Sequence, residues 1–261
     1  MPFFHHQGAE LHYTLAGDGP PLVLLHGFGS SQLDWELQVA EFGAHFQLIM
    51  PDFRGFGDSS KDAPPFSVEQ FSEDLGALLD HLKIQRFSML GYSLGGAVAF
   101  DVSVSQPERI ERLVLVNTWP SFRADTFKKK RELWTRRTLV RLSGMPQMAR
   151  VLGKRLFPES GQEALRATFE ERYSKNDKAV YLKLLNTLPT WSVREQINRL
   201  AMPILVVGAE HDYTPFSEKE AYVADMATAT LVKIEGSRHG TPFDRREEFN
   251  ALVLGFLRDG L

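Results

Sequence analysis

Residues 91–95 read Gly-Tyr-Ser-Leu-Gly and lie between an apolar strand-like stretch and a helix-forming stretch. The pattern G-x-S-x-G is typical of a sharp strand-to-helix turn, in which strained backbone geometry exposes the serine hydroxyl. Small residues beside the serine let strand and helix approach closely, a need that Gly91, Gly95 and Gly96 meet. The stretch therefore predicts a nucleophilic Ser93 before a helix whose free N–H groups can stabilise negative charge.

The pentapeptide alone also fits a glycine-rich loop, so its meaning depends on whether an acid and a histidine follow in that order. Asp212 ends a loop that leaves the strand-like run at 203–207, Pro-Ile-Leu-Val-Val. His239 lies in the loop after a second strand-like run at 229–234. Because the carboxyl ends of parallel strands meet at one edge of a sheet, we expect Ser93, Asp212 and His239 to lie together.

These three residue types can perform acyl transfer. A neutral His239 can accept the Ser93 proton and return it to the leaving group, while Asp212 fixes the tautomer and stabilises the imidazolium. The oxyanion needs two N–H donors, and we expect one from Leu94, directly after the nucleophile. The second is expected from Phe28, which lies in a glycine-flanked turn after another strand-like run.

Several motifs occur together in one order. Residues 26–29 read H-G-F-G, and residues 52–60 read D-F-R-G-F-G-D-S-S. The G-x-S-x-G turn at 91–95, called the nucleophile elbow, follows. With Asp212 and His239 in the acid and base positions, the chain resembles the α/β-hydrolase-fold serine hydrolases, in particular carboxylesterase-like members, over nearly its whole length. The resemblance implies an α/β fold with a mostly parallel twisted sheet, flanking helices and an inserted helical cap. Dehalogenase-like and epoxide-hydrolase-like relatives carry Asp as nucleophile, so a serine here favours ester chemistry.

Strand-like and helical patterns alternate along the chain, as parallel βαβ units require. From about residue 120 to 196 the strand signals vanish, and they resume at Pro203. We therefore expect a core domain of residues 1–119 and 197–261, with a helical cap at 120–196 inserted in it. Strands are expected at about 11–15, 22–25, 46–50, 87–90, 113–116, 203–207 and 229–234, and helices at 33–42, 68–81, 94–105 and 246–257.

The expected cap is basic. Residues 121–160 carry eleven Lys or Arg against three Asp or Glu, although the whole chain has a formal net charge of −3. A solvated helix face is the ordinary explanation of such a run. The alternative is a basic rim, including Lys128, Lys129 and Lys130, that attracts an acidic substrate or an acyl carrier.

Aromatic residues lie at the junction with the cap and within it. Trp119 follows a strand-like run, and together with Tyr92, beside the nucleophile, it is expected to line the substrate pocket. For Phe122, Trp134 and Trp191 we expect ordinary packing between cap and core.

Two further polar positions allow alternatives. Asp52 is a second candidate acid, but it precedes Ser93 and so breaks the expected order. We expect Asp52 and Arg54 to brace loops by hydrogen bonding. Arg238 stands before His239, where the family commonly has Gly, and we expect its side chain to point to solvent rather than to the imidazole.

Composition excludes several other classes of function. The 261 residues include no Cys, which excludes a thiol nucleophile, disulfides and Cys-ligated zinc. The His residues are scattered, so no metal site is expected, and no nucleotide-binding motif points to a cofactor. The net charge of −3 argues against nucleic acid as a partner. No segment reaches the roughly 18 apolar residues of a membrane span, and the N-terminus lacks a basic, apolar leader. We expect a cytoplasmic protein.

The expected reaction is hydrolysis of a carboxylic ester in a small to medium substrate through an acyl-enzyme on Ser93. Lactone hydrolysis, C–C bond hydrolysis and a cofactor-free lyase or acyl transferase are alternatives that use the same triad. A ligand-binding protein on a hydrolase scaffold is a more remote alternative, because binding alone does not need triad, elbow and oxyanion residues together.

Overall fold

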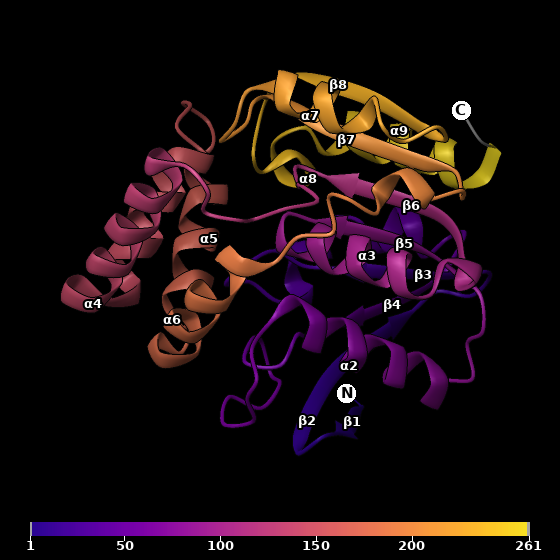
Figure 1. Ribbon diagram of the computed structural model, residues 1–261, viewed down its shortest axis with the longest axis horizontal. Helices are drawn as coiled ribbons and strands as arrows, with labels where there is room; N and C mark the ends of the chain where they lie inside the picture. Colours follow the sequence, from indigo (N-terminus) through magenta and orange to yellow (C-terminus); the bar gives the residue numbers. More distant parts are fainter. Residues whose placement is uncertain (1, 260–261) are drawn as a thin grey trace.

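The computed structural model describes residues 2–259, within which eight strands form one sheet with helices on both faces (Figure 1). The strands lie in the order β1-β2-β4-β3-β5-β6-β7-β8. Pairing is antiparallel from β1 through β2 to β4 and parallel from β4 to β8, which confirms the expected mostly parallel sheet. The strands are β1 (Phe3–His6), β2 (Ala9–Ala16), β3 (Pro21–Leu25), β4 (Gln47–Pro51), β5 (Phe87–Tyr92), β6 (Ile110–Val116), β7 (Ile204–His211) and β8 (Ala229–Arg238).

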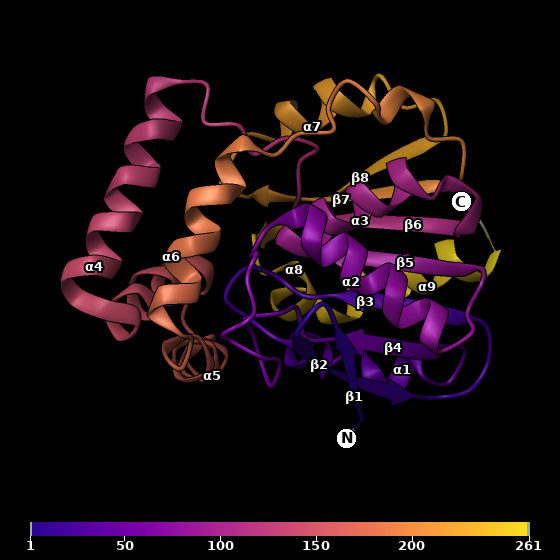
Figure 2. The same cartoon turned by 60° about the horizontal axis from the view of Figure 1, so that its bottom comes forward.

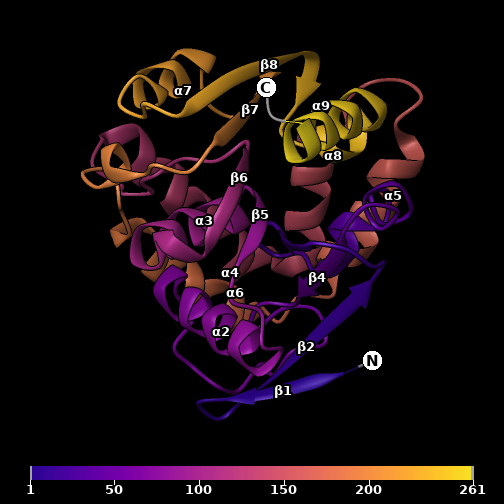
Figure 3. The same ribbon diagram turned by 90° about the vertical axis from the view of Figure 1, so that its right-hand side faces the viewer.

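The helices are α1 (Val39–Phe42), α2 (Val68–His81), α3 (Leu94–Ser105), α4 (Phe127–Leu156), α5 (Glu163–Ser174), α6 (Lys178–Thr187), α7 (Phe216–Val223), α8 (Thr241–Asp244) and α9 (Arg246–Asp259). Helices α2, α3 and α7 contribute to the apolar core on one face of the sheet, and α8 and α9 to the core on the other (Figure 3). Helix α1 adds Phe42 to this second core. Among residues 2–259, no helix combines the length and apolar character needed to cross a lipid bilayer.

Burial on both faces explains why the central strands are apolar without alternation. In β7, the side chains of residues 204–207 are 0% exposed, and so are those of residues 113–116 in β6. Each of these strands ends in a polar loop at the same edge of the sheet. Pairing of these apolar strands therefore places the two polar loops side by side.

Helices α2 and α3 have the expected bounds. Helix α2 begins after Ser67, whose side chain accepts a hydrogen bond from the Gln70 N–H. The expected helix at 33–42 is wrong, because the chain there forms a 3₁₀ turn (Gln32–Trp35) and then the short α1. Asp34 is the physical reason, since its carboxylate accepts the Gly27 N–H and ties the turn to the loop after β3. The short strand β1 was not expected.

The chain between β6 and β7 forms the inserted helices α4, α5 and α6, which stand beyond one end of the sheet (Figures 1 and 2). They share a small apolar core that includes Met148, Tyr173 and Tyr181. Helix α4 bends at Gly144, where φ is 72° and ψ is −176°. Entry and exit of the insertion are joined by an antiparallel bridge between Ser121 and Ser192.

Gly95 in the first turn of α3 lies close to the backbone of β3. A Cβ atom at this position would stand 2.2 Å from the Leu25 carbonyl oxygen of β3. We expect Gly95→Ala to lower the free energy of unfolding by about 3 kcal/mol or more, because backbone must move to admit the methyl group. Urea denaturation measures the change.

The matched control is Gly255→Ala in α9, where a Cβ would meet no atom within 4 Å. Here we expect a gain of about 0.5–1 kcal/mol from helix propensity. Equal stability of the two variants would contradict the close approach of α3 to β3.

Candidate active site

Ser93 occupies the turn between β5 and α3 with φ 54° and ψ −111°. A positive φ is strained for a residue with a side chain, and such strain concentrates at functional sites. The turn is held by two hydrogen bonds, from the Ser93 N–H to the Val116 carbonyl (2.9 Å) and from the Thr118 hydroxyl to the Ser93 carbonyl (2.7 Å). The serine side chain is thereby fixed above the end of the sheet.

His239 connects the serine to a carboxylate. Its Nε2 lies 3.0 Å from Ser93 Oγ, and its Nδ1 lies 2.6 Å from Asp212 Oδ1. With Nδ1–H donating to the carboxylate, Nε2 is the acceptor that faces the hydroxyl. The structure thus brings together the three residues that the sequence predicts, in an arrangement that can move a proton from serine to imidazole.

Asn117 ties the loops of the site together. It has a positive φ of 46° directly after β6, a conformation that Asn tolerates better than most residues. Its amide donates to the His239 carbonyl (2.8 Å), and its side-chain oxygen accepts the Ala209 N–H (2.9 Å). One side chain therefore links the carboxyl ends of β6, β7 and β8.

Aromatic rings enclose the imidazole. The Tyr213 ring stacks on His239 at 4.1 Å between centroids, and the Trp119 ring lies parallel to it at 6.3 Å. The Tyr92 ring lies 5.5 Å from His239 at an angle of 44°. These contacts fix the plane of the imidazole.

Asp212 has a second ionic partner, Lys219 of α7. The Lys219 ammonium lies 2.5 Å from Asp212 Oδ2, and both side chains are 0% exposed. The ammonium also lies 4.5 Å from the centroid of the Trp119 ring. Burial alone would raise the pKa of the Asp212 carboxyl, but charge interactions and hydrogen bonds with His239 and Lys219 outweigh burial and hold it at about 2. Asp212 is therefore ionised throughout the neutral range.

The residues predicted as oxyanion donors, Phe28 and Leu94, both line the cavity that contains Ser93. Leu94 is the first residue of α3, where backbone N–H groups have no partner within the helix. The loop that carries Phe28 is fixed by Asp34, whose carboxylate accepts hydrogen bonds from the Gly27 N–H (3.0 Å) and the Ser30 hydroxyl.

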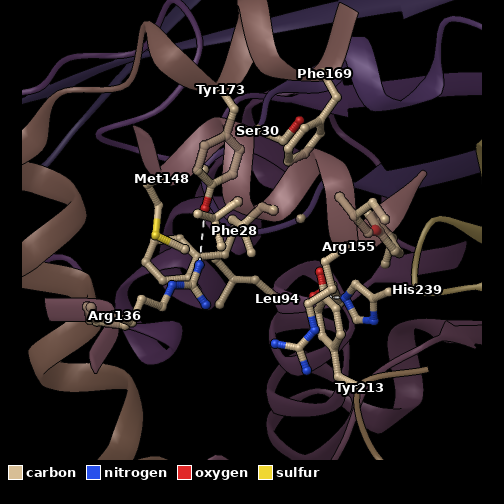
Figure 4. A pocket seen from close by; sticks show the side chains of 18 of the residues that line it. Phe28, Ser30, Leu94, Arg136, Met148, Arg155, Phe169, Tyr173, Tyr213 and His239 are labelled. Atoms are coloured by element: carbon tan, nitrogen blue, oxygen red, sulfur yellow. Dashed lines mark hydrogen bonds between the residues drawn. The ribbon is translucent and has the colours of Figure 1, made fainter. Parts of the chain in front are cut away.

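Ser93 and His239 line a cavity of about 860 Å³ between the sheet and the inserted helices. Tyr92, Trp119 and Phe122 line it. Trp134 is instead 66% exposed, and buried Trp191 donates its indole N–H to Asp101 (3.0 Å). Figure 4 shows Phe28, Leu94 and Arg136 toward one side of the cavity, with Arg155, Tyr213 and His239 toward the other.

The second candidate acid, Asp52, has no hydrogen bond to Ser93 or His239 within residues 2–259. It lies 2.8 Å from His12 Nδ1, and it accepts the N–H groups of Gln32 (2.7 Å) and Asp58 (3.0 Å). Arg54 makes a two-pronged ion pair with Asp74. Both residues brace loops in this structure.

His12, Asp52 and Asp58 are also a group whose potential metal-ligand atoms lie within 4.8 Å of one another. Both Asp52 oxygens already accept hydrogen bonds from the surrounding loops. We therefore assign this group to loop structure.

Arg238 does not stack on the imidazole. Its side chain is 33% exposed, and its Nε lies 3.9 Å from a Glu159 oxygen in the loop between α4 and α5. This long ion pair, which the sequence did not predict, reaches the insertion, and Arg238 Nε has no hydrogen-bond partner among residues 2–259.

Sequence reasoning missed four residues of the site: Asp34, Arg136, Tyr213 and Lys219. Lys219 has the pattern of an ordinary surface lysine, and Arg136 lies within a basic run. Tyr213 and Asp34 could have been inferred from their positions beside Asp212 and close to the H-G-F-G loop. The other two depend on how separate elements pack.

Comparison with known proteins is consistent with this geometry. A family model described as the alpha/beta hydrolase fold matches residues 20–245. A putative carbamate hydrolase RutD from Azorhizobium caulinodans is 26% identical over 262 residues, covering 98% of this chain and 98% of that protein. The likeness therefore includes the insertion as well as the sheet.

Two solved structures are similar over their whole length. An enol-lactonase from Burkholderia xenovorans LB400 has a TM-score of 0.90 and 27% identity, covering 99% of this chain and 100% of that one. A thermophilic esterase from Thermogutta terrifontis has a TM-score of 0.89 and 25% identity, covering 99% of this chain and 97% of that one.

The Lys219–Asp212 ion pair gives a pH-dependent prediction. Lys219 partly neutralises the carboxylate that stabilises the imidazolium of His239. Removing the cation in Lys219→Met should favour the imidazolium, so the acidic limb of the kcat/KM profile should move to higher pH. Because Asp212 also loses an orienting partner, kcat/KM at its optimum should fall by about tenfold or more.

The control is Lys175→Met, which removes an exposed lysine paired with Glu171 and should leave the profile unchanged. A Lys219→Met protein that is less stable but keeps the wild-type midpoint of the acidic limb would show that Lys219 acts on folding alone.

Proposed function

Since the chain belongs to the alpha/beta hydrolase fold family, we propose that it hydrolyses a carboxylic ester of a small to medium substrate through an acyl-enzyme on Ser93. The observation that carries the proposal is the continuous line of hydrogen bonds from Ser93 through His239 to Asp212, opening into a cavity. A protein that only binds a ligand would not need this chain of hydrogen bonds.

In the proposed mechanism, His239 Nε2 accepts the hydroxyl proton as Ser93 Oγ attacks the acyl carbonyl. Negative charge develops on the carbonyl oxygen, where the N–H groups of Phe28 and Leu94 stabilise it. The imidazolium, stabilised by Asp212, then gives its proton to the leaving-group oxygen. A water molecule attacks the acyl-enzyme by the same steps and restores the free serine.

We assign the two expected parts of the chain different roles. Residues 1–119 and 197–261 carry the triad and the oxyanion donors, and residues 120–196 act as a cap that encloses the substrate. The bridge between Ser121 and Ser192, which lies close to both limits, supports this division. Tyr92 and Trp119 contribute to the pocket beside the imidazole.

Ser93→Ala removes the nucleophile and should lower kcat for p-nitrophenyl esters by about a thousandfold or more. The measurement is steady-state hydrolysis at pH 7 to 8 across acyl chains from acetyl to dodecanoyl, which also maps the acyl pocket.

Ser105→Ala is the matched control, since Ser105 is exposed at the end of α3 and, among residues 2–259, its hydroxyl bonds only to carbonyls of its own helix. It should retain wild-type rates. Equal activity of wild type and Ser93→Ala would remove the basis of the proposal.

Lactone hydrolysis is a second candidate, favoured by the likeness to an enol-lactonase. A lactone is a cyclic ester, so the same acyl-enzyme forms and the leaving group stays attached to the acyl chain. We expect Ser93-dependent opening of simple lactones such as δ-valerolactone, followed by acid release in a pH-stat. A lactone rate that survives in Ser93→Ala would exclude this route.

A further inference from the structure

One side of the cavity contains a fixed cation, the half-buried Arg136 of α4. Its Nε donates to the Tyr181 hydroxyl (2.6 Å), and its Nη2 donates to the Tyr173 hydroxyl (3.1 Å; Figure 4). The guanidinium also lies 4.9 Å from the centroid of the Phe28 ring. Hydrogen bonds and ring contacts thus hold the guanidinium in one orientation while Nη1 has no partner within residues 2–259.

No carboxylate of the described chain pairs with Arg136. Its nearest polar partners are hydroxyls, and burial raises the pKa of Tyr173 well above 10, so that hydroxyl stays neutral. Four acids line the cavity, and none of them pairs with Arg136. Glu36 pairs with Arg172, and Asp34 is hydrogen-bonded within its own loop. The other two are Glu132 and Glu218. A guanidinium keeps its charge at any ordinary pH. Leaving a partly buried cation unpaired is costly, and a bound anion would remove that cost.

The position of Arg136 relative to Ser93 and His239 indicates which part of the substrate would carry the anionic group. His239 must reach the leaving-group oxygen, so the leaving group lies on the imidazole side of Ser93. Arg136 lies on the other side, next to Phe28 and Leu94 (Figure 4). That side accommodates the acyl chain.

A second arginine gives a contrast within the same helix. Arg155 is exposed and lies over the Tyr213 ring at 4.4 Å, on the side of His239. No side-chain hydroxyl holds its guanidinium. Arg155 is thus an exposed cation on the leaving-group side, whereas Arg136 is held by tyrosine hydroxyls on the acyl side.

We propose that the substrate is an ester or lactone whose acyl portion bears a second, free carboxylate, and that Arg136 binds this carboxylate. The proposal rests on the proposed ester hydrolysis for the identity of the scissile bond. Arg136 is planar and presents two parallel donors, the geometry that matches a carboxylate. It would select among esters by charge, while the aromatic walls accept the intervening chain.

The first test measures binding without turnover. Ser93→Ala protein is titrated calorimetrically with monomethyl esters of dicarboxylic acids, from succinate to suberate, and with the corresponding dimethyl esters. We expect one monoester to bind about 100-fold more tightly than its neutral diester. Adding Arg136→Met should remove this difference, and Arg136→Lys should restore part of it.

The second test measures kcat/KM of the wild type for the same pairs, followed by acid release. The ratio of monoester to diester should be about 100 and should fall toward one in Arg136→Met. Arg150→Met is the control, because Arg150 is an exposed residue of α4 outside the cavity whose nearest partner is Gln147. It should keep the wild-type ratio.

The outcomes separate the two proposals. Equal binding and equal turnover of monoesters and diesters would overturn the carboxylate site and leave ester hydrolysis standing. Arg136-dependent binding of monoesters without turnover of any ester would support the site and overturn the reaction. If Arg136→Met does not fold, the wild type and the Arg136→Lys protein still decide. A wild type that does not prefer monoesters would contradict the assignment to Arg136, and so would an Arg136→Lys protein that keeps the full wild-type preference.

Discussion

Helix α3 lies so close to β3 that a Cβ atom on Gly95 would stand 2.2 Å from the Leu25 carbonyl oxygen. This contact sets the tight turn from β5 into α3 and with it the strained backbone of Ser93. Every other part of the site is arranged around that fixed hydroxyl. A looser packing of α3 would leave the serine free to relax and the first N–H groups of the helix misaligned.

Asp212 and His239 reach this point from β7 and β8, which pair with one another in the sheet. His239 is oriented by hydrogen bonds at both ring nitrogens and by stacked aromatic rings. Asp212 is shared between the imidazole and a buried ammonium. A lone buried carboxylate would tend to take up a proton, whereas this one has a pKa of about 2 and keeps its charge. The ion pair thus helps to keep Asp212 ionised beside the imidazole.

The inserted helices give the cavity a second polar feature. Most of the excess positive charge of residues 121–160 lies on exposed surface, as expected for a solvated helix face. Lys128 and Lys130, for example, are exposed. Arg136 differs because its helix packs against α6 and the Phe28 loop, where tyrosine hydroxyls fix it in the cavity. The same basic run therefore contains both ordinary surface charge and one residue suited to substrate recognition.

The amino-acid sequence by itself determined every strand of the sheet except β1, the helices α2 and α3, and the candidate residues Ser93, Asp212 and His239. These follow from local patterns, since apolar runs specify buried parallel strands and catalytic groups occupy the loops at their carboxyl ends. Only the tertiary structure decided that Lys219 pairs with Asp212, that Arg136 enters the cavity and that Asp34 breaks the expected helix at 33–42. Each of these depends on a contact between elements far apart in the chain or on a loop that folds back. No local periodicity predicts which charged side chain of a helix faces inward.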